Sequence, residues 1–195
     1  MSKPHLSRVI RVITIAPVMA LLLLLALYIT RPQYFGGMLN FLLAVVFLAV
    51  FPVLAYPIQP LVPGFRHKGR EGQRSLAIWM SGIGYLLGIL TAAFMAVPRQ
   101  MWIIYLTYFI SGILIILFNK VFKVKASGHT CGVAGPLFTA ICFIGPVAAL
   151  GGIILAAVYR ASLSMRRHSK SELLLGTAIP ALALLLSFSI ITVIN

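Results

Sequence analysis

Long apolar stretches alternate with short polar, mostly basic stretches along the whole chain. A helix needs about 20 apolar residues to cross the hydrocarbon core of a bilayer. Five stretches approach or reach that length, at about residues 9–29, 38–56, 76–97, 101–118 and 173–194. The pattern predicts a membrane-spanning helix over each of them. We expect the second helix to stop at the prolines that begin with Pro57, because proline interrupts helical hydrogen bonding, and segment 65–75 to be a flexible basic loop.

The apolar stretch 131–159 has two interpretations: one long helix, or a hairpin of two short helices broken at Gly145-Pro146. With the hairpin, segments 1–11, 66–74, 120–125 and 160–170 share one side and hold fourteen of the sixteen Lys and Arg residues. With a single helix, ten of the sixteen Lys and Arg residues lie on one side of the membrane and six on the other. Short cytoplasmic loops carry the Lys/Arg excess. The charge pattern therefore favours the hairpin, with the N-terminus and the basic loops in the cytoplasm.

Composition excludes a soluble domain. The 195 residues are 61% hydrophobic and only 9% charged, with a mean hydropathy of +1.06, whereas soluble domains carry about 25% charged residues. Sixteen basic residues oppose two acids, Glu71 and Glu172, for a net charge of +14. The basic residues are dispersed among loops, without a stacking platform or recognition helix, which argues against a nucleic-acid partner. We predict an all-α integral membrane protein: a single polytopic domain over residues 1–195, a bundle of six to seven transmembrane helices in the cell membrane.

His168 and Glu172 are the first candidates for chemistry. They are four residues apart, so one helical turn would place the carboxylate beside the imidazole. A carboxylate that accepts from one ring nitrogen makes the other nitrogen a better base or nucleophile. The alternative is an ordinary helix start, where Glu172 would be favourable beside the positive end of the helix dipole.

Residues 125–130, Lys-Ala-Ser-Gly-His-Thr, lead directly into an apolar helix. Free N–H groups at a helix N-terminus bind anions, and Gly128 permits close approach to the backbone. Ser127 and Thr130 are equally good helix caps. Capping does not explain why His129 and three lysines, at 120, 123 and 125, occupy the same turn. If the basic loops converge on one membrane face, these groups provide what phosphoryl transfer requires: a nucleophile, an acid and cations for the phosphate oxygens.

These motifs resemble those of the type 2 phosphatidic acid phosphatase superfamily of membrane lipid phosphatases. The second family motif, Pro-Ser-Gly-His, is similar to residues 126–129, with Ala126 in place of proline. The third, Ser-Arg, five residues, His, three residues, Asp, is similar to residues 168–172, with Glu172 in place of aspartate and Ser162 where the motif has arginine. The first, Lys, six residues, Arg-Pro, is matched loosely by Lys68 and Arg74, which are separated by five residues and followed by serine.

The resemblance implies a role for each matching residue. His168 would be the nucleophile that forms a phosphohistidine, Glu172 would orient it, and His129 would be the general acid. The remaining implied positions bind phosphate: Lys68, Arg74, Ser127 and Gly128, with Arg160 or Arg166 standing in for the absent arginine. The chemistry needs no metal and no cofactor, and the few carboxylates and unclustered Cys and His residues offer no metal cage.

The function expected from the resemblance is a metal-independent phosphatase acting on a membrane lipid phosphate or diphosphate, such as an isoprenyl phosphate or diphosphate, phosphatidic acid or phosphatidylglycerol phosphate. The phosphatase-like core would cover about residues 64–195, after two helices at about 9–57. Two alternatives stay open: an inactive relative that binds or translocates a phospholipid head group, and a structural membrane protein with basic anchoring loops. The expected partners are the lipid substrate and the bilayer, and a homo-oligomer is compatible with the sequence.

Overall fold

The computed structural model describes residues 3–194, and their side chains from His5 to Val193. This part of the chain consists of helices joined by short loops, with no strand. The α-helices are α1 (Lys3–Ile13), α2 (Ala16–Thr30), α3 (Met38–Val45), α4 (Phe51–Ile58), α5 (Gly69–Phe94), α6 (Arg99–Ile116), α7 (Gly128–Ile144), α8 (Gly152–Ser164) and α9 (Lys170–Ile194). Short 3-10 helices are η1 (Pro32–Tyr34), η3 (Gln59–Leu61) and η5 (Pro146–Gly151), and π-helical turns are η2 (Val46–Val50) and η4 (Leu117–Val121).

Five continuous helical segments of the described chain are long and apolar enough to cross a membrane. They are Met38–Leu61, Gly69–Phe94, Arg99–Val121, Pro146–Ser164 and Lys170–Val193. The pair α1 and α2 makes a sixth if it is counted as one broken span, and α7 is a shorter apolar helix. The predicted all-helical membrane fold is confirmed at this level, with five or six spans by length and composition against the six to seven expected.

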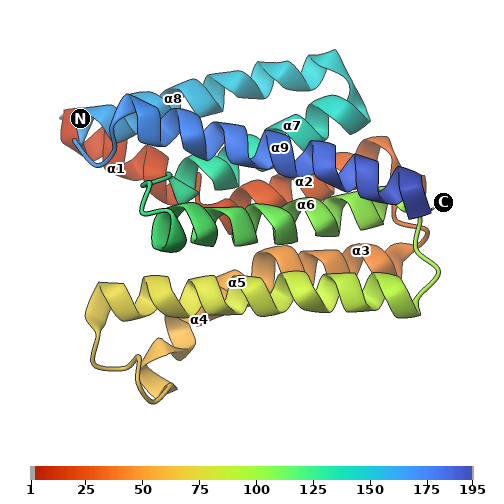
Figure 1. The fold of residues 1–195 in the computed structure, drawn as a ribbon, viewed down its shortest axis with the longest axis horizontal. Coiled ribbons are helices and arrows are strands. Elements are labelled where there is room, and N and C mark those ends of the chain that lie inside the picture. Colours follow the sequence, from red (N-terminus) through yellow and green to blue (C-terminus); the bar gives the residue numbers. More distant parts are fainter. Residues whose placement is uncertain (1–2, 195) are drawn as a thin grey trace.

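The predicted break at Gly145-Pro146 is present. Gly145 ends α7 with a φ of 119°, a backbone conformation that favours glycine, and Pro146 opens η5, which leads into α8. Residues 131–159 are therefore a hairpin of two helices and not one long helix (Figure 1).

The prediction of one continuous helix over residues 9–29 was wrong. Helices α1 and α2 meet at an angle of 52°, and the residue between them, Ile15, is extended. Pro17 explains the break, because it lies in the first turn of α2 and has no N–H with which to continue α1. The bend separates a basic, amphipathic α1 from an apolar α2.

Of two expected helix ends, one is confirmed and one was wrong. The second span ends within the expected proline cluster, at Leu61, although α4 contains Pro57 and continues through η3. Segment 65–75 is only partly a loop, because α5 already begins at Gly69. Glu71 in the first turn favours this early start, since a negative charge stabilises the positive end of the helix dipole.

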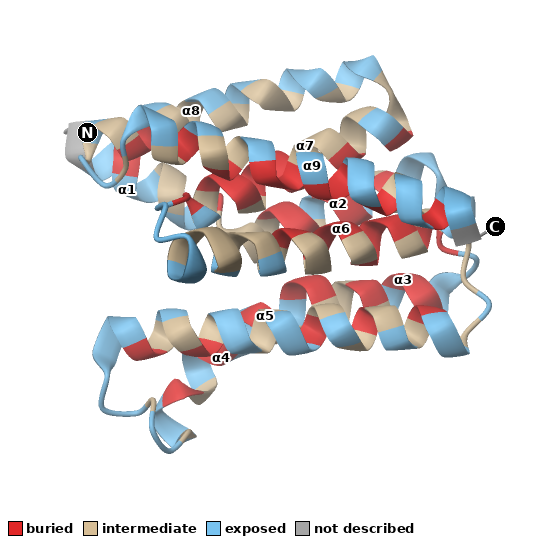
Figure 2. Cartoon of the chain, in the orientation of Figure 1, coloured by how far each residue is buried: buried red, intermediate tan, exposed pale blue. Residues whose placement is uncertain are grey.

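The core lies where α2, α6, α7 and α9 face one another, and Figure 2 shows the buried residues concentrated on these facing sides. Tyr105 of α6 and Leu24 of α2 are fully buried there. The α3–α4 segment and α5 pack together as an adjoining layer. Many outward-facing apolar side chains, such as Ile29, Phe94 and Val193, are exposed, as expected for surfaces in contact with lipid.

One end of the bundle brings together segments that are far apart in the sequence. In Figure 1, α1, the start of α7, the end of α8 and the start of α9 lie at the end marked N, and the α7–α8 turn lies at the opposite end. Helix α1 packs against α8, and α7 packs against both α2 and α9. Residues from the two halves of the chain therefore meet at this end.

Candidate functional site

The starts of α7 and α9 are joined through their backbones. The Ser127 N–H donates to the carbonyl oxygen of Glu172 at 3.0 Å. Gly176, one turn further along α9, permits this approach, because a Cβ at that position would lie 2.4 Å from the Ser127 carbonyl oxygen. The segment before α7 is held as well: the Asn119 side chain accepts from the Ala126 N–H at 3.1 Å and donates to the Ala126 carbonyl at 3.2 Å.

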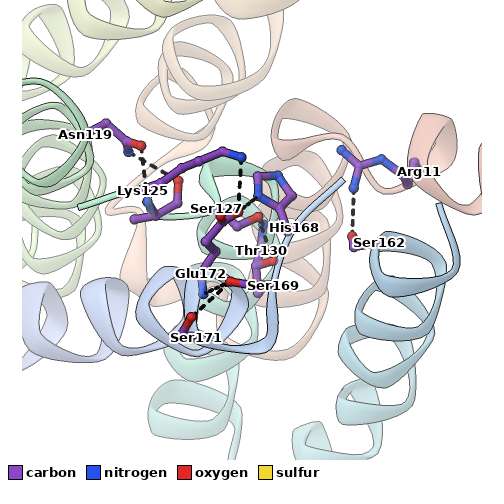
Figure 3. Close-up of polar contacts among 11 residues, drawn as sticks. Arg11, Asn119, Lys125, Ser127, Thr130, Ser162, His168, Ser169, Ser171 and Glu172 are labelled. Carbon is purple, nitrogen blue, oxygen red and sulfur yellow. Dashed lines mark hydrogen bonds and ion pairs between the residues drawn. The ribbon is translucent and has the colours of Figure 1, made fainter. Parts of the chain in front are cut away.

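His168 and Glu172 form the pair that the sequence predicts. Nδ1 of His168 lies 2.6 Å from Oε2 of Glu172, and the same oxygen lies 3.4 Å from Nζ of Lys125 (Figure 3). His168 precedes α9, and Ser169 caps that helix by accepting from the Glu172 N–H at 3.2 Å. The pair is mostly shielded, with 18% and 19% of the side chains exposed, whereas the Lys125 side chain is 63% exposed. The Glu172 carboxylate therefore orients the His168 imidazole and also binds Lys125, which lies in the segment before α7.

The first turn of α7 has two unpaired backbone donors. Ser127 is fully buried, and its hydroxyl oxygen accepts from the N–H of Thr130 at 3.3 Å and from its hydroxyl at 2.9 Å. The Ser127 side chain is thus used as a helix cap. The N–H groups of Gly128 and His129 have no partner among the described residues, as expected at a helix start. Gly128 is exposed, and a Cβ there would meet only a methyl group of Ile115 at 4.0 Å, so the surrounding side chains do not require glycine at this position.

His129 is bound to the helix break between α1 and α2. Its Nε2 lies 3.1 Å from the hydroxyl of Thr14, which donates to the Ile10 carbonyl at 2.7 Å. Because the threonine proton is used there, the imidazole donates from Nε2 and keeps Nδ1 as an acceptor. His129 lies outside the five long apolar helices. Burial lowers the pKa of His129 to about 4, and the positive charge of Arg11 adds to the effect. The imidazole is therefore neutral at pH 7 in the ligand-free protein.

Arg11 is the residue that the sequence did not single out, because it is one of several basic residues in segment 1–11. Its Nη1 donates to the Ser162 hydroxyl on α8 at 2.7 Å (Figure 3). A second polar contact, 2.8 Å between the hydroxyls of Ser7 and Ser164, also joins α1 to α8. Ser162 occupies the position at which the family motif has arginine. The sequence alone does not link Arg11 to Ser162, because the two meet only through the packing of α1 on α8.

The other predicted phosphate-binding residues lie at the edge of this cluster or outside it. Arg74 is exposed on α5, within electrostatic range of Arg11. The Lys68 ammonium lies 5.9 Å from the ring of Phe65, and none of its described contacts reaches His168 or His129. Arg160 and Arg166 are both exposed, and neither has a described side-chain contact with the cluster. Lys125, one of the three lysines before α7, contacts Glu172, and Arg11 contacts Ser162. These two residues are thus more directly connected to the cluster than Lys68, Arg160 or Arg166.

An apolar groove opens beside Thr14. It has a volume of about 280 Å³ and is lined by side chains of α1, α2 and α8, among them Ile10, Met19 and Ile154. Since Thr14 also contacts His129, the groove begins next to the polar cluster.

Comparisons with protein-family models, with curated proteins and with solved structures give no match to this chain. Within the described residues, no three His, Cys, Asp or Glu side chains gather in a way that would hold a metal ion. The chemistry of the site must therefore be inferred from its own geometry.

Proposed function

We propose that this protein is a membrane lipid phosphatase that transfers phosphate from a lipid phosphate or diphosphate to His168 and then to water. The observation that carries the proposal is the contact of 2.6 Å between Nδ1 of His168 and the Glu172 carboxylate. Nδ1–H donates to the carboxylate, so the lone pair of the imidazole is on Nε2, the nitrogen without a described partner.

The reaction follows from this arrangement in two balanced steps. Nε2 of His168 attacks phosphorus, the bond between phosphorus and the lipid oxygen breaks, and the leaving oxygen takes up a proton. Water then attacks the phosphohistidine, loses a proton, and releases inorganic phosphate and free His168. Glu172 stabilises the positive charge that develops on the imidazole.

His129 is the proposed proton donor, as the family resemblance implies. Its lowered pKa makes it neutral in the free protein, so it needs a nearby negative charge before it can carry a second proton. A bound phosphate provides that charge and raises the pKa. The same phosphate would accept hydrogen bonds from the free N–H groups of Gly128 and His129 at the start of α7.

The position of the cluster supports a lipid substrate. The basic segments lie at the end of the bundle where α1 and the starts of α7 and α9 gather (Figure 1), and we propose that this end is the cytoplasmic face of the cell membrane. The phosphate would lie at the polar cluster and its apolar chain in the groove beside Thr14. A head group that binds but is never cleaved is the second candidate, and the substitutions at the family positions Ser75, Ser162 and Glu172 favour it.

The test is phosphate release by the purified protein in detergent, with EDTA present. The substrates are an isoprenyl diphosphate, phosphatidic acid and phosphatidylglycerol phosphate. We expect His168→Ala to abolish release and Glu172→Gln to lower kcat by about 10²- to 10⁴-fold, the range seen when a carboxylate that orients a histidine is removed. His67→Ala is the matched control, because His67 is exposed in another basic loop and bonds to Arg66.

Three results are informative. Release that is lost in His168→Ala and kept in His67→Ala supports the phosphatase. Release that persists in His168→Ala contradicts the mechanism. Saturable binding of the lipids without any release favours the head-group binder.

A further inference from the structure

Arg11 is a half-buried arginine whose side chain is only partly used by the protein. One nitrogen donates to Ser162, which is fully buried on α8. A guanidinium has five N–H donors in a planar fork. The remaining donors of Arg11 have no partner among the described residues. Figure 3 shows the side chain reaching from α1 over Ser162, on the side toward His168.

The charges around Arg11 are positive. Arg167, next to His168 in the chain, and Arg74 act on it electrostatically. The two ion pairs in the described part of the chain both use Glu172, and neither includes Arg11. A partly buried charge without a counter-ion is costly. Arg11 therefore has positive neighbours and no counter-ion among the described residues, and a bound anion would supply one.

The position of Ser162 adds a second, independent observation. It lies six residues before His168, and its hydroxyl holds the Arg11 guanidinium at 2.7 Å. His129 lies within electrostatic range of both Arg11 and His168. In Figure 3 the guanidinium, held by Ser162, extends from α1 toward the side on which His168 lies.

We propose that Arg11 is a phosphate-binding residue of this site: its guanidinium, held by Ser162, binds a non-bridging oxygen of the substrate phosphate beside His168. This inference rests on the proposed function for the identity of the substrate, but the binding of a phosphate group can be measured without turnover. It assigns to α1 a part of the site that neither Arg160 nor Arg166 provides.

The experiment exchanges the two side chains. Five proteins are compared with the wild type: Arg11→Ser, Ser162→Ala, Ser162→Arg, the double variant Arg11→Ser/Ser162→Arg, and Arg8→Ala. Arg8 is the matched control, because it lies on the same helix and is exposed. Each protein is tested for binding of inorganic phosphate, for kcat and KM with the best lipid substrate, and for the midpoint of thermal unfolding.

We expect Arg11→Ser to weaken phosphate binding by about tenfold or more and to lower kcat/KM by about 100-fold, as for the loss of one preorganised charged donor. Ser162→Ala should lose less than about tenfold, because the guanidinium itself remains. Arg8→Ala should stay within about twofold of the wild type, because an exposed charge is largely screened. The double variant should recover at least about tenfold over Arg11→Ser, since a guanidinium returns to the same place from α8.

A purely structural role predicts a different pattern. If Arg11 only holds α1 on α8, Arg11→Ser and Ser162→Ala should lower the unfolding midpoint equally and leave the phosphate affinity unchanged. That result would overturn the inference, as would wild-type protein that binds no inorganic phosphate. If the wild type binds phosphate through Arg11 but hydrolyses no lipid, the proposed function fails and the assignment of Arg11 stands.

Discussion

Replacing Gly176 with alanine is the sharpest test of how the site is assembled. A Cβ at position 176 would lie 2.4 Å from the Ser127 carbonyl oxygen and 3.2 Å from the Ser127 carbonyl carbon and Cβ. Ordinary contact begins at 3.4 Å, so α9 would have to move away from the start of α7 by about 1 Å. The obstacle is backbone, which cannot rotate out of the way as a side chain can.

The consequence for the site follows from the distances. A movement of about 1 Å would break the hydrogen bond of 3.0 Å between Ser127 and Glu172 and the ion pair of 3.4 Å between Lys125 and Glu172. A misplacement of about 1 Å costs about 100-fold in rate when reacting groups must be aligned. We therefore expect kcat for phosphate release to fall by about 100-fold, and stability to fall by about 1–3 kcal/mol from overpacking.

The control is Gly135→Ala, at the same interface between α7 and α9. A Cβ there would contact Cβ of Pro180 at 3.4 Å, which is ordinary contact. Both substitutions gain the same helix propensity, about 1 kcal/mol, so the comparison isolates the clash. Initial rates over a range of lipid concentrations, with the thermal midpoint of each protein, decide the matter. Wild-type kcat in a folded Gly176→Ala protein would refute the assembly described above, and so would an equal loss in Gly135→Ala.

Three further predictions concern Gly128 and His129. Gly128→Ala should fold normally, because the added Cβ has room, yet it should weaken binding of inorganic phosphate by about tenfold if the anion lies against the α7 amides; unchanged affinity would exclude that position. His129 should titrate near pH 4 in the free protein, because burial and then the charge of Arg11 lower its pKa. Bound phosphate should raise the titration midpoint of His129, as followed by NMR of labelled histidine. A midpoint that is the same with and without phosphate would show that His129 does not lie beside the bound phosphate. Stability should fall as the pH drops from about 6.5 toward 4, since the unfolded chain takes up a proton that the folded chain does not.

The pairing of His168 with Glu172 was predictable because both residues lie within one short segment. Their spacing of four residues limits how far apart the side chains can be. The hairpin at Gly145 was predictable from the charges of the flanking loops together with Gly145-Pro146, although the same dipeptide at Gly135-Pro136 lies inside α7. Pro17 also disfavours a helix that continues through it, but the apolar residues on both sides of it predict an uninterrupted span. The length of an apolar stretch predicts whether it can cross the membrane, but it does not predict whether the helix bends within the stretch.

The contacts that complete the site could not be predicted in this way. Arg11 and Ser162 are 151 residues apart in the sequence, and Thr14 and His129 are 115 apart. Each contact depends on which helices are neighbours. Gly132 decides part of this, because a Cβ there would lie 2.4 Å from Cβ of Ala16, so only glycine lets α7 approach the start of α2 closely enough for Thr14 to reach His129.

The sequence by itself determined the membrane environment, the helical class and the pair His168–Glu172, because each depends on composition or on residues within one turn of each other. Only the tertiary structure decided that α1 bends at Ile15, lies on α8 and brings Arg11 and Thr14 to the histidines. Backbone contact at Gly132 and Gly176 sets which helices pack together, and such contact depends on the shape of whole helices, which no local pattern of residues encodes.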